Sequence, residues 1–427
     1  MEIKDTRLIV SKSLAERIRR LGSRAAANIA AVVMVVAVAG SCQSGGSSDD
    51  DGVYAVDADT CMYSDEFYVG ADLSNANELE DAGVKYTLGG DTIDIYKTIH
   101  KFGGNLVRLR LWHNPTWGKY SKLDDVKRGA KRIKDANMKF MLDFHYSDTW
   151  TDQERSIAPA AWTSIAKVTE TLVDSVYNYT FTTLEELNKD GVLPSVVQLG
   201  NELHNNMMVL NSSELTPLDH KRNAQLINAA LKAVRDFNRS NHTEVKTALH
   251  VGLQDKGTLK WVKDMKDNGL KRFDILAISY YPQWHGYSIK KLGKLSADLY
   301  RKHGVQLLVA ETGHIWTHSW NDNTNNIMDE GYSEYADAVC PQMQKDFLLS
   351  VKHALRANRG YGVLAWEPEW VSSNVTTRWG NGSTWENVAF FDFKNEMLLH
   401  GGMDFLNDNN GKAVSYTHLT LPTILRV

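Results

Sequence analysis

The 427-residue chain has little cysteine, and it lacks both a glycine-rich phosphate-binding turn and an internal repeat. One of its three cysteines, Cys42, lies in the N-terminal segment. The other two, Cys61 and Cys340, could form one disulfide outside the cytoplasm, although the sequence does not show that they meet. No early apolar run is followed by the turn of a dinucleotide-binding fold, which disfavours a doubly wound open sheet.

Clustered positive charge is also missing from the body of the chain. The formal net charge is −4, and residues 1–42 contribute +4 through seven Lys/Arg against three Asp/Glu. The remaining residues therefore carry −8, the difference between these two values. Because nucleic-acid phosphates need clustered Lys and Arg, the acidic body argues against a nucleic-acid partner and against a polyanionic substrate. A neutral substrate fits this charge better.

The long apolar stretch of the chain is the 16-residue run at 25–40, which follows a segment rich in Arg and Lys. A membrane-spanning helix needs roughly 20 apolar residues, whereas an export signal has a shorter apolar region. The residues AGSC that end at Cys42 resemble the lipobox of a bacterial lipoprotein, in which this cysteine would be lipidated. We predict a signal over 1–42 and an exported lipoprotein of the outer membrane or cell surface. A plain secretory signal, giving a periplasmic or secreted protein, is the alternative.

Three segments follow Cys42. Residues 43–65 begin with QSGGSSDDDG, which has no apolar residue and predicts a flexible acidic linker that resembles the surface-export signals of Bacteroidetes lipoproteins. Residues 66–410 carry the regular pattern of a folded domain. Residues 411–427 break this pattern, and SYTHLTLPT resembles translated sequencing-adapter sequence, so we predict a non-native tail there.

Apolar runs alternate with amphipathic segments throughout 66–410. Helical spacing is clear near residue 95 and over 123–136, and longer helical stretches cover 163–188, 217–239, 256–268, 288–302 and 338–357. The eight expected strands are the runs at 67–72, 105–112, 139–146, 195–201, 245–251, 273–281, 305–311 and 361–366. Eight strands alternating with helices predict an α/β fold, a single (β/α)₈ TIM barrel with enlarged βα loops.

Two of the expected strands lead into a glutamate. VVQLGNE ends at Glu202 after the fourth strand, and LLVAETG contains Glu311 at the end of the seventh. Because the C-terminal strand ends of such a barrel form its catalytic face, two carboxylates there are typical of a glycoside hydrolase. Either glutamate alone could instead be a helix cap or a solvated loop residue. The 12 Trp and 17 Tyr, many of them in loops, favour the enzyme because aromatic rings stack on sugars.

A series of motifs at the strand ends resembles glycoside hydrolase family 53, the endo-β-1,4-galactanases. In chain order they are GADLS (70–74), RLRLWHNP (108–115), DFHYSDTW (143–150), GNE (200–202), SYYP (279–282), ETG (311–313), WEPEW (366–370) and STWEN (383–387). The resemblance implies hydrolysis of internal bonds in β-1,4-galactan with retention and without a required cofactor. It assigns the acid/base role to Glu202 and the nucleophile role to Glu311, with carboxyls ~5–5.5 Å apart.

Strand alternation adds polar residues to this site. Arg108, Arg110 and Trp112 share one face of the second strand. Two arginines inside a barrel need carboxylate partners, so we expect one to contact Glu311 and the other to form a structural ion pair deeper in the barrel. Asp143 and His145 share a face at the end of the third strand. A metal site is conceivable there, but the resemblance favours hydrogen bonds to substrate.

The resemblance also assigns roles around the two glutamates. Tyr281 would donate a hydrogen bond to Glu311, with its neighbour Tyr280 less favoured. Trp366 would stack beneath the sugar beside the cleaved bond, and Asn201 would bind the 2-hydroxyl of that sugar. Weaker candidates for the cleft, each of which could be loop packing, are Asp72, Trp112, Asp148, Trp150, Trp284 and Trp385.

Other carboxylates and oxygen donors lie nearby. Glu367 and Glu369 in WEPEW compete for the catalytic role, although the family pattern treats them as structural, and His314 stands where the family more often has Tyr. The loop at 320–326 is rich in oxygen donors that suit a structural calcium ion, but a plain Asx-turn loop explains it equally well. Its expected ligands are Asp322, Asn323 and Asn325.

Two other functions stay open on the sequence. The chain could be another endo-β-glycanase from the clan of (β/α)₈ glycosidases to which family 53 belongs, a mannanase or a cellulase, because loops set the specificity. It could also be a surface lipoprotein that captures glycans without cleaving them, although the presence of both Glu202 and Glu311 argues against this. We expect a monomer that touches the membrane only through its lipid anchor.

Overall fold

The computed structural model describes residues 66–253, 255–329 and 339–407. The predictions for the signal with Cys42, for the linker with Cys61 and for the tail therefore lie outside the described residues. No helix within the described ranges is long and apolar enough to cross a membrane.

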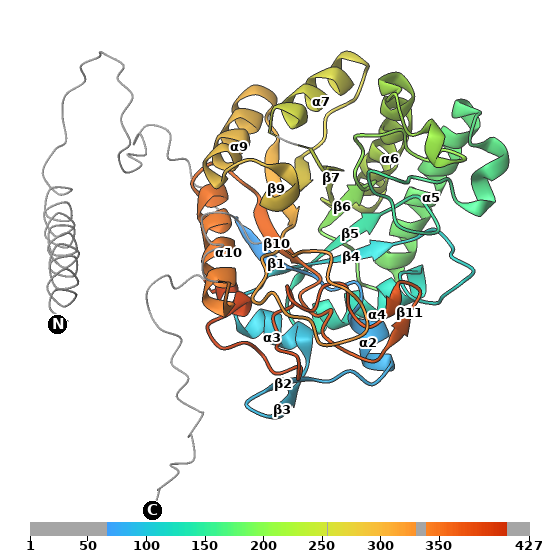
Figure 1. The fold of residues 1–427 in the computed structure, drawn as a ribbon. Helices are drawn as coiled ribbons and strands as arrows, with labels where there is room; N and C mark the ends of the chain where they lie inside the picture. Colours follow the sequence, from blue (N-terminus) through green and yellow to red (C-terminus); the bar gives the residue numbers. More distant parts are fainter. Residues whose placement is uncertain (1–65, 254, 330–338, 408–427) are drawn as a thin grey trace, which may run out of the picture. The chain divides into compact units, whose positions relative to one another are not determined.

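Eight parallel strands close into a barrel, as the sequence predicts (Figure 1). The order around the barrel is β1-β10-β9-β8-β7-β6-β5-β4, and β1 also pairs with β4. Every predicted strand is present, with slightly shorter bounds. They are β1 (Tyr68–Asp72), β4 (Leu106–Leu111), β5 (Lys139–Phe144), β6 (Val196–Leu199), β7 (Lys246–Val251), β8 (Ile275–Ser279), β9 (Gln306–Glu311) and β10 (Gly362–Trp366).

Amphipathic helices surround the strands (Figure 1). In α4, which confirms the helical spacing over 123–136, the face with Val126, Ala130 and Ile133 is buried, and charged residues occupy most of the remaining surface. The main helices are α3 (Ile95–Lys101), α4 (Leu123–Asp135), α5 (Thr169–Lys189), α6 (His220–Asn241), α7 (Asp255–Asp267), α9 (Ile289–His303) and α10 (Pro341–Arg356). Shorter elements include α2 (Ala76–Asp81), α8 (Pro282–His285), the 3₁₀ turns at Ala160–Ile165, Ser212–Glu214 and Gly402–Leu406, and two small hairpins, β2–β3 (Tyr86–Leu88, Asp91–Ile93) and β11–β12 (Thr376–Thr377, Gly380–Asn381).

The barrel interior changes from apolar to polar along the strands. Its lower layer is one buried apolar cluster, to which β4 contributes Leu106 and β5 contributes Met141. Two residues further on, the same faces carry Arg108 and Asp143, because side chains alternate along a strand. The period-2 pattern thus builds an apolar floor and places buried charges above it, at the C-terminal edge.

Candidate active site

Glu202 follows β6 in a turn with unusual backbone geometry. Its φ is +49°, and Gly200 just before it has φ +100°. Other residues are strained at this φ of Gly200, and a Cβ there would also lie 2.5 Å from the Leu203 side chain, so the turn favours glycine. The backbone N–H of Glu202 donates to Nδ1 of His250 on β7, at 3.1 Å. A non-glycine residue held in the left-handed region is typical of a functional site, where the surrounding contacts maintain the strain.

Glu311 reaches the same place through an irregularity in the sheet. The preceding residue, Ala310, belongs to the apolar floor, so strict alternation would turn Glu311 away from the interior. A register shift between Ile278 and Ser279 instead pairs Ser279 with Glu311 on the neighbouring strand. The Ser279 hydroxyl donates to Oε2 of Glu311 at 3.0 Å, and Nη1 of Arg108 lies 2.9 Å from Oε1. The Glu311 carboxylate therefore faces a buried positive charge.

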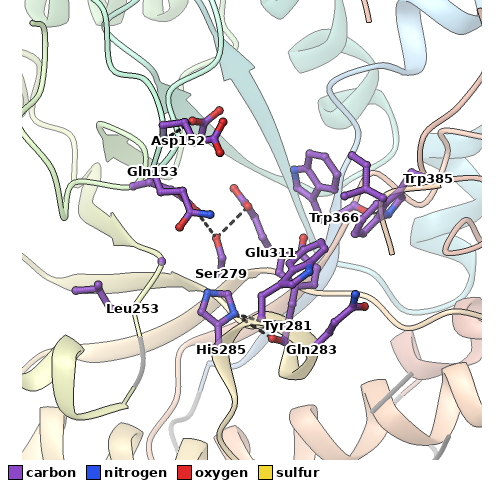
Figure 2. Close-up of a pocket in the computed structure, with 15 residues that line it drawn as sticks. Asp152, Gln153, Leu253, Ser279, Tyr281, Gln283, His285, Glu311, Trp366 and Trp385 are labelled. Carbon is purple, nitrogen blue, oxygen red and sulfur yellow. Dashed lines mark hydrogen bonds between the residues drawn. The ribbon is translucent and has the colours of Figure 1, made fainter. Parts of the chain in front are cut away.

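The environment of Glu202 favours its protonated form. Burial raises the pKa of Glu202 to about 8, and the nearby Glu311 charge adds to this shift. Its Oε1 also lies 3.3 Å from the Ser279 hydroxyl, so one oxygen atom contacts both glutamates. Figure 2 shows Ser279 beside Glu311, with Trp366 and Trp385 to one side. Burial thus favours a proton on Glu202, while Arg108 places a positive charge beside Glu311.

Arg108 connects the strand ends beneath the two glutamates. Its side chain is 2% exposed, and its three guanidinium nitrogens all have partners. The partners, at 2.8–3.1 Å, are Asp72, Asp143, Gln198, Asn201 and Glu311. Burial works to raise the pKa of Asp143, but the charge of Arg108, together with the neighbouring His145, outweighs it and holds this pKa at about 2. The predicted contact between an arginine and Glu311 is therefore present, and Arg108 makes it.

Arg110 forms the second, structural ion pair. It lies 2.8 Å from Glu367, and its guanidinium stacks over the Trp150 ring with 3.7 Å to the centroid. Glu367 and Glu369 are fully buried, and burial raises the pKa of Glu367 to about 8 and that of Glu369 well above its ordinary value. Neither side chain reaches a cavity wall. Their competition for the catalytic role is not supported, because a sugar could not reach them.

Two adjoining cavities meet at the glutamates. The larger has a volume of about 800 Å³ and the smaller about 300 Å³, and both are lined by Glu202, Glu311 and Trp366. Of the other predicted residues, Tyr281, Trp284 and Trp385 line the larger cavity, while Asn201 and Trp150 line the smaller one. Asn201 is already bonded, since its amide donates to the Thr151 carbonyl at 2.8 Å.

Several predicted substrate contacts do not reach these cavities. Each of the side chains is buried in the layer below, where it holds other residues in place; they are Asp72, Arg108, Arg110, Trp112, Asp143 and His145. Nε2 of His145 lies 3.0 Å from Asp143, and its Nδ1 accepts the Thr151 N–H at 3.1 Å. Both ring nitrogens are therefore occupied. The described residues hold no cluster of three His, Cys, Asp or Glu suited to a metal.

Tyr281 differs from its predicted role. It is 5% exposed and its ring packs near Trp385, but none of the hydrogen bonds of the described residues joins it to Glu311. Ser279, two residues earlier on the same face, makes that bond instead. The Tyr280 hydroxyl donates to the Tyr287 carbonyl and faces away, as the weaker prediction for it suggests.

The loop at 320–326 does not fit the predicted calcium ligands. The Asp322 carboxylate accepts backbone N–H groups of Thr324, Ser373 and Ser383, so its lone pairs stabilise the loop as an Asx turn. Asn323 and Asn325 are exposed. With its only carboxylate already bonded, this trio is a poor site for a cation that prefers several oxygen ligands. His314, where the family more often has Tyr, is buried and lines neither cavity.

A model of glycosyl hydrolase family 53 matches residues 68–400. The chain belongs to this family. The arabinogalactan endo-beta-1,4-galactanase of Cellvibrio japonicus is 40% identical over 76% of this chain and 86% of that protein. The endo-beta-1,4-galactanase of Bacillus subtilis is 28% identical over 78% and 84%. The GH53 catalytic domain of Ignisphaera aggregans has a TM-score of 0.70 at 27% identity, covering 80% of this chain and 95% of its own.

A solved structure of fungal beta-1,4-galactanases gives a TM-score of 0.68 at 25% identity, covering 79% of this chain and 98% of its own. These comparisons confirm the resemblance, the (β/α)₈ fold and the assignment as a glycoside hydrolase. The sequence did not predict three residues that lie beside the glutamates: Ser279, His250 and Gly252. Ser279 and His250 form hydrogen bonds with a glutamate, and Gly252 leaves space beside Glu202. None of these contacts follows from a known sequence motif.

The pKa of Glu202 predicts the alkaline limit of this family 53 enzyme. We expect kcat/KM on its glycan substrate to fall about tenfold per pH unit above a midpoint near 8, because an ionised Glu202 cannot protonate the leaving oxygen. The measurement is a pH profile from 5 to 10. The Glu202→Gln variant, assayed with an aryl glycoside that needs no proton, should lack this limb. A limb that persists there would assign it to another group, such as Glu367.

Gly252 makes room for the acid/base. It follows β7, and a Cβ at this position would lie 2.6 Å from Oε1 of Glu202. We expect Gly252→Ala to lower kcat/KM by roughly 10²-fold, since a displacement of this size misplaces a catalytic group. The control is Gly257→Ala in α7, where a Cβ would meet only Leu253 at an ordinary 3.6 Å. Equal activity of the two variants would show that Glu202 tolerates the added methyl group.

Proposed function

We propose that this family 53 enzyme is a retaining endo-β-1,4-galactanase that hydrolyses internal β-1,4-galactosidic bonds in the galactan and type I arabinogalactan side chains of pectin. The observation that carries the proposal is the paired environment of Glu202 and Glu311. The galactanase names of its relatives and the galactanase-like motif series at the strand ends support this substrate over mannan or cellulose.

The spacing of the two glutamates favours retention. The Ser279 oxygen lies 3.0 Å from one carboxyl and 3.3 Å from the other, so the nearest carboxyl oxygens cannot be farther apart than these two distances together. Such closeness is compatible with the ~5–5.5 Å between the carboxyl groups of a retaining pair.

The chemistry then follows two steps. A Glu311 carboxylate oxygen attacks the anomeric carbon while Glu202 gives its proton to the departing glycosidic oxygen, which leaves a glycosyl ester on Glu311. In the second step Glu202, now ionised, takes a proton from water as the water oxygen attacks the same carbon. The ester bond breaks, Glu311 leaves as a carboxylate, and the product keeps the original anomeric configuration.

The cavity walls suit a neutral polysaccharide. Trp366 and Trp385 line the space beside Glu311, and Trp284, 45% exposed, extends the aromatic wall outward. Aromatic faces bind sugar rings through their C–H groups without requiring charge. Because the two cavities adjoin at the catalytic pair, a chain can continue on both sides of the cleaved bond. This arrangement supports internal cleavage.

The test is reducing-end release from potato-type β-1,4-galactan, with β-mannan and carboxymethylcellulose as controls. We expect release from galactan alone, medium-length oligosaccharides early in digestion, and a β-anomer as the first product by proton NMR. Release from mannan or cellulose instead would reject the substrate but keep the mechanism. Galactan binding without any release would favour a capture protein.

We also propose, from the sequence, that the enzyme is exported, lipidated at Cys42 and held as a monomer at the outer membrane or cell surface. The apolar run at 25–40 and the AGSC sequence support this. The test is incorporation of labelled palmitate by the full chain in a bacterial host, compared with Cys42→Ser. Secretion of unlabelled protein by both would favour the plain secretory signal.

A further inference from the structure

The Ser279 hydroxyl lies between the two catalytic glutamates. Its oxygen is 3.0 Å from Oε2 of Glu311 and 3.3 Å from Oε1 of Glu202, and the side chain is buried within the wall of the larger cavity. A serine hydroxyl has one hydrogen, so it can donate to only one of these carboxyls at a time. The position is fixed by the register shift after Ile278, which sets Ser279 directly beside Glu311.

His250 determines which hydrogen bond the Ser279 oxygen accepts. The backbone N–H of Glu202 donates to Nδ1 of His250 at 3.1 Å, so that nitrogen must offer a lone pair. The neutral ring then carries its hydrogen on Nε2, which lies 3.3 Å from the Ser279 oxygen and 3.9 Å from Oε1 of Glu311. His250 is fully buried, which also favours its neutral form. The Ser279 oxygen therefore accepts from His250, and its own hydrogen is free to select a glutamate.

We propose that Ser279 is a positioning residue whose single hydrogen follows the negative charge from Glu311 to Glu202 during the catalytic cycle, while His250 holds the serine oxygen. The inference rests on the proposed retaining mechanism. In the free enzyme the charge is on Glu311, and the shorter of the two contacts, at 3.0 Å, is to that carboxylate. In the glycosyl-enzyme Glu311 is an ester and Glu202 is ionised, so the hydroxyl rotates to donate to Glu202.

No atom or electron is transferred through Ser279 in this scheme. In the first step the proton of Glu202 goes to the leaving oxygen, and the electron pair of Glu311 forms the ester. In the second step a water proton goes to Glu202, and the electron pair of the ester bond returns to Glu311. Ser279 stabilises whichever carboxylate is charged, at a distance that the barrel fixes, and it keeps the ionised Glu202 aimed at the attacking water.

The test is a kinetic double-mutant cycle on the full chain with a 2,4-dinitrophenyl β-galactobioside. This leaving group needs no proton, so steady-state turnover after the burst reports the second step. We expect Ser279→Ala to slow that step by ~10-fold or more, the effect of losing a hydrogen bond to a charged group. In a Glu202→Ala enzyme with azide as the nucleophile, the second step needs no base. The same serine substitution should then cost about threefold or less.

Equal slowing in both backgrounds would overturn the proposal, because Ser279 would then act through Glu311 alone. No slowing in either would show that the contact has no kinetic role. The structural control is Ser296→Ala in α9, another buried serine, whose hydroxyl donates to the Asn358 carbonyl far from the site. If Ser279→Ala melts well below this control, Ser279→Cys, which keeps the volume and a weak donor, replaces it and should show an intermediate loss.

Failure of the proposed function has a different signature. A wild-type enzyme that releases no dinitrophenol from the galactobioside has another glycan specificity. The same double-mutant cycle is then measured on the aryl glycoside that the wild type does cleave. We expect Ser279→Ala to slow the second step by the same factors in the wild-type and Glu202→Ala backgrounds as above. A specific loss of the second step in Ser279→Ala supports the hydroxyl's role whatever the sugar.

Discussion

Replacing Glu311 with glutamine should reduce kcat on galactan by ~10⁴–10⁶-fold, the scale seen when a covalent nucleophile is removed from a working active site. The amide has nearly the same shape, and its single oxygen can still accept a hydrogen bond from Arg108 while its NH2 group donates to the Ser279 oxygen. It cannot form the glycosyl ester, and it removes the charge that stabilises the developing positive charge at the anomeric carbon. Substrate binding should persist, so the measurement is kcat with galactan affinity determined separately.

The control for this loss is Glu367→Gln. Glu367 is also a buried glutamate beside a strand end, but it pairs with Arg110 and lines neither cavity. We expect its kcat to stay within roughly tenfold of the wild type, because it touches no reacting atom.

Reactions with azide test which glutamate is the nucleophile and which is the acid/base. Glu311→Ala with azide should yield the α-glycosyl azide, and Glu202→Ala should yield the β-azide. The opposite pairing would reverse the two roles.

The sequence predicts the barrel and the catalytic pair because both depend on local patterns. Continuous apolar runs mark the eight strands, and each glutamate lies at the end of such a run or within three residues after it. The sequence also predicts that Arg108 has a carboxylate partner, since a buried arginine on an inward face needs one. That it contacts Glu311 while Arg110 pairs with Glu367 depends on strand neighbours far apart in the chain.

The sequence could not predict how near each side chain lies to the sugar. Asp72 and Asp143 occupy strand ends like those of Glu202 and Glu311, yet they lie one layer deeper, bonded to Arg108. Alternation sets the face of a side chain but not its depth in a closed barrel. Ser279 was missed for a related reason. Its contact with both glutamates depends on a register shift, and nothing in SYYP signals an extra residue in the pairing.

The largest loss of stability is expected from Arg108→Met. The substitution keeps a similar length of apolar side chain but removes the positive charge that faces Asp72, Asp143 and Glu311 inside the barrel. Removing one partner of a buried ion pair typically costs about 3–5 kcal/mol, because the remaining charge has lost both water and counter-ion. We expect the free energy of unfolding to fall by at least this much at pH 7, measured by urea titration.

Arg128→Met is the matched control, since Arg128 also makes two 2.8 Å hydrogen bonds to a carboxylate, that of Asp81, but at the surface. Replacing Arg128 should lower the free energy of unfolding by about 1 kcal/mol or less.

The pH dependence of stability is a second test of the role of Arg108. The depressed pKa of Asp143 contributes stability that is present above its unfolded pKa and is lost as the pH falls toward about 2. The difference in the free energy of unfolding between the wild type and Arg108→Met should therefore become smaller as the pH falls. A difference that stays constant from pH 7 to pH 3 would mean that lost packing, rather than lost charge, destabilises the variant.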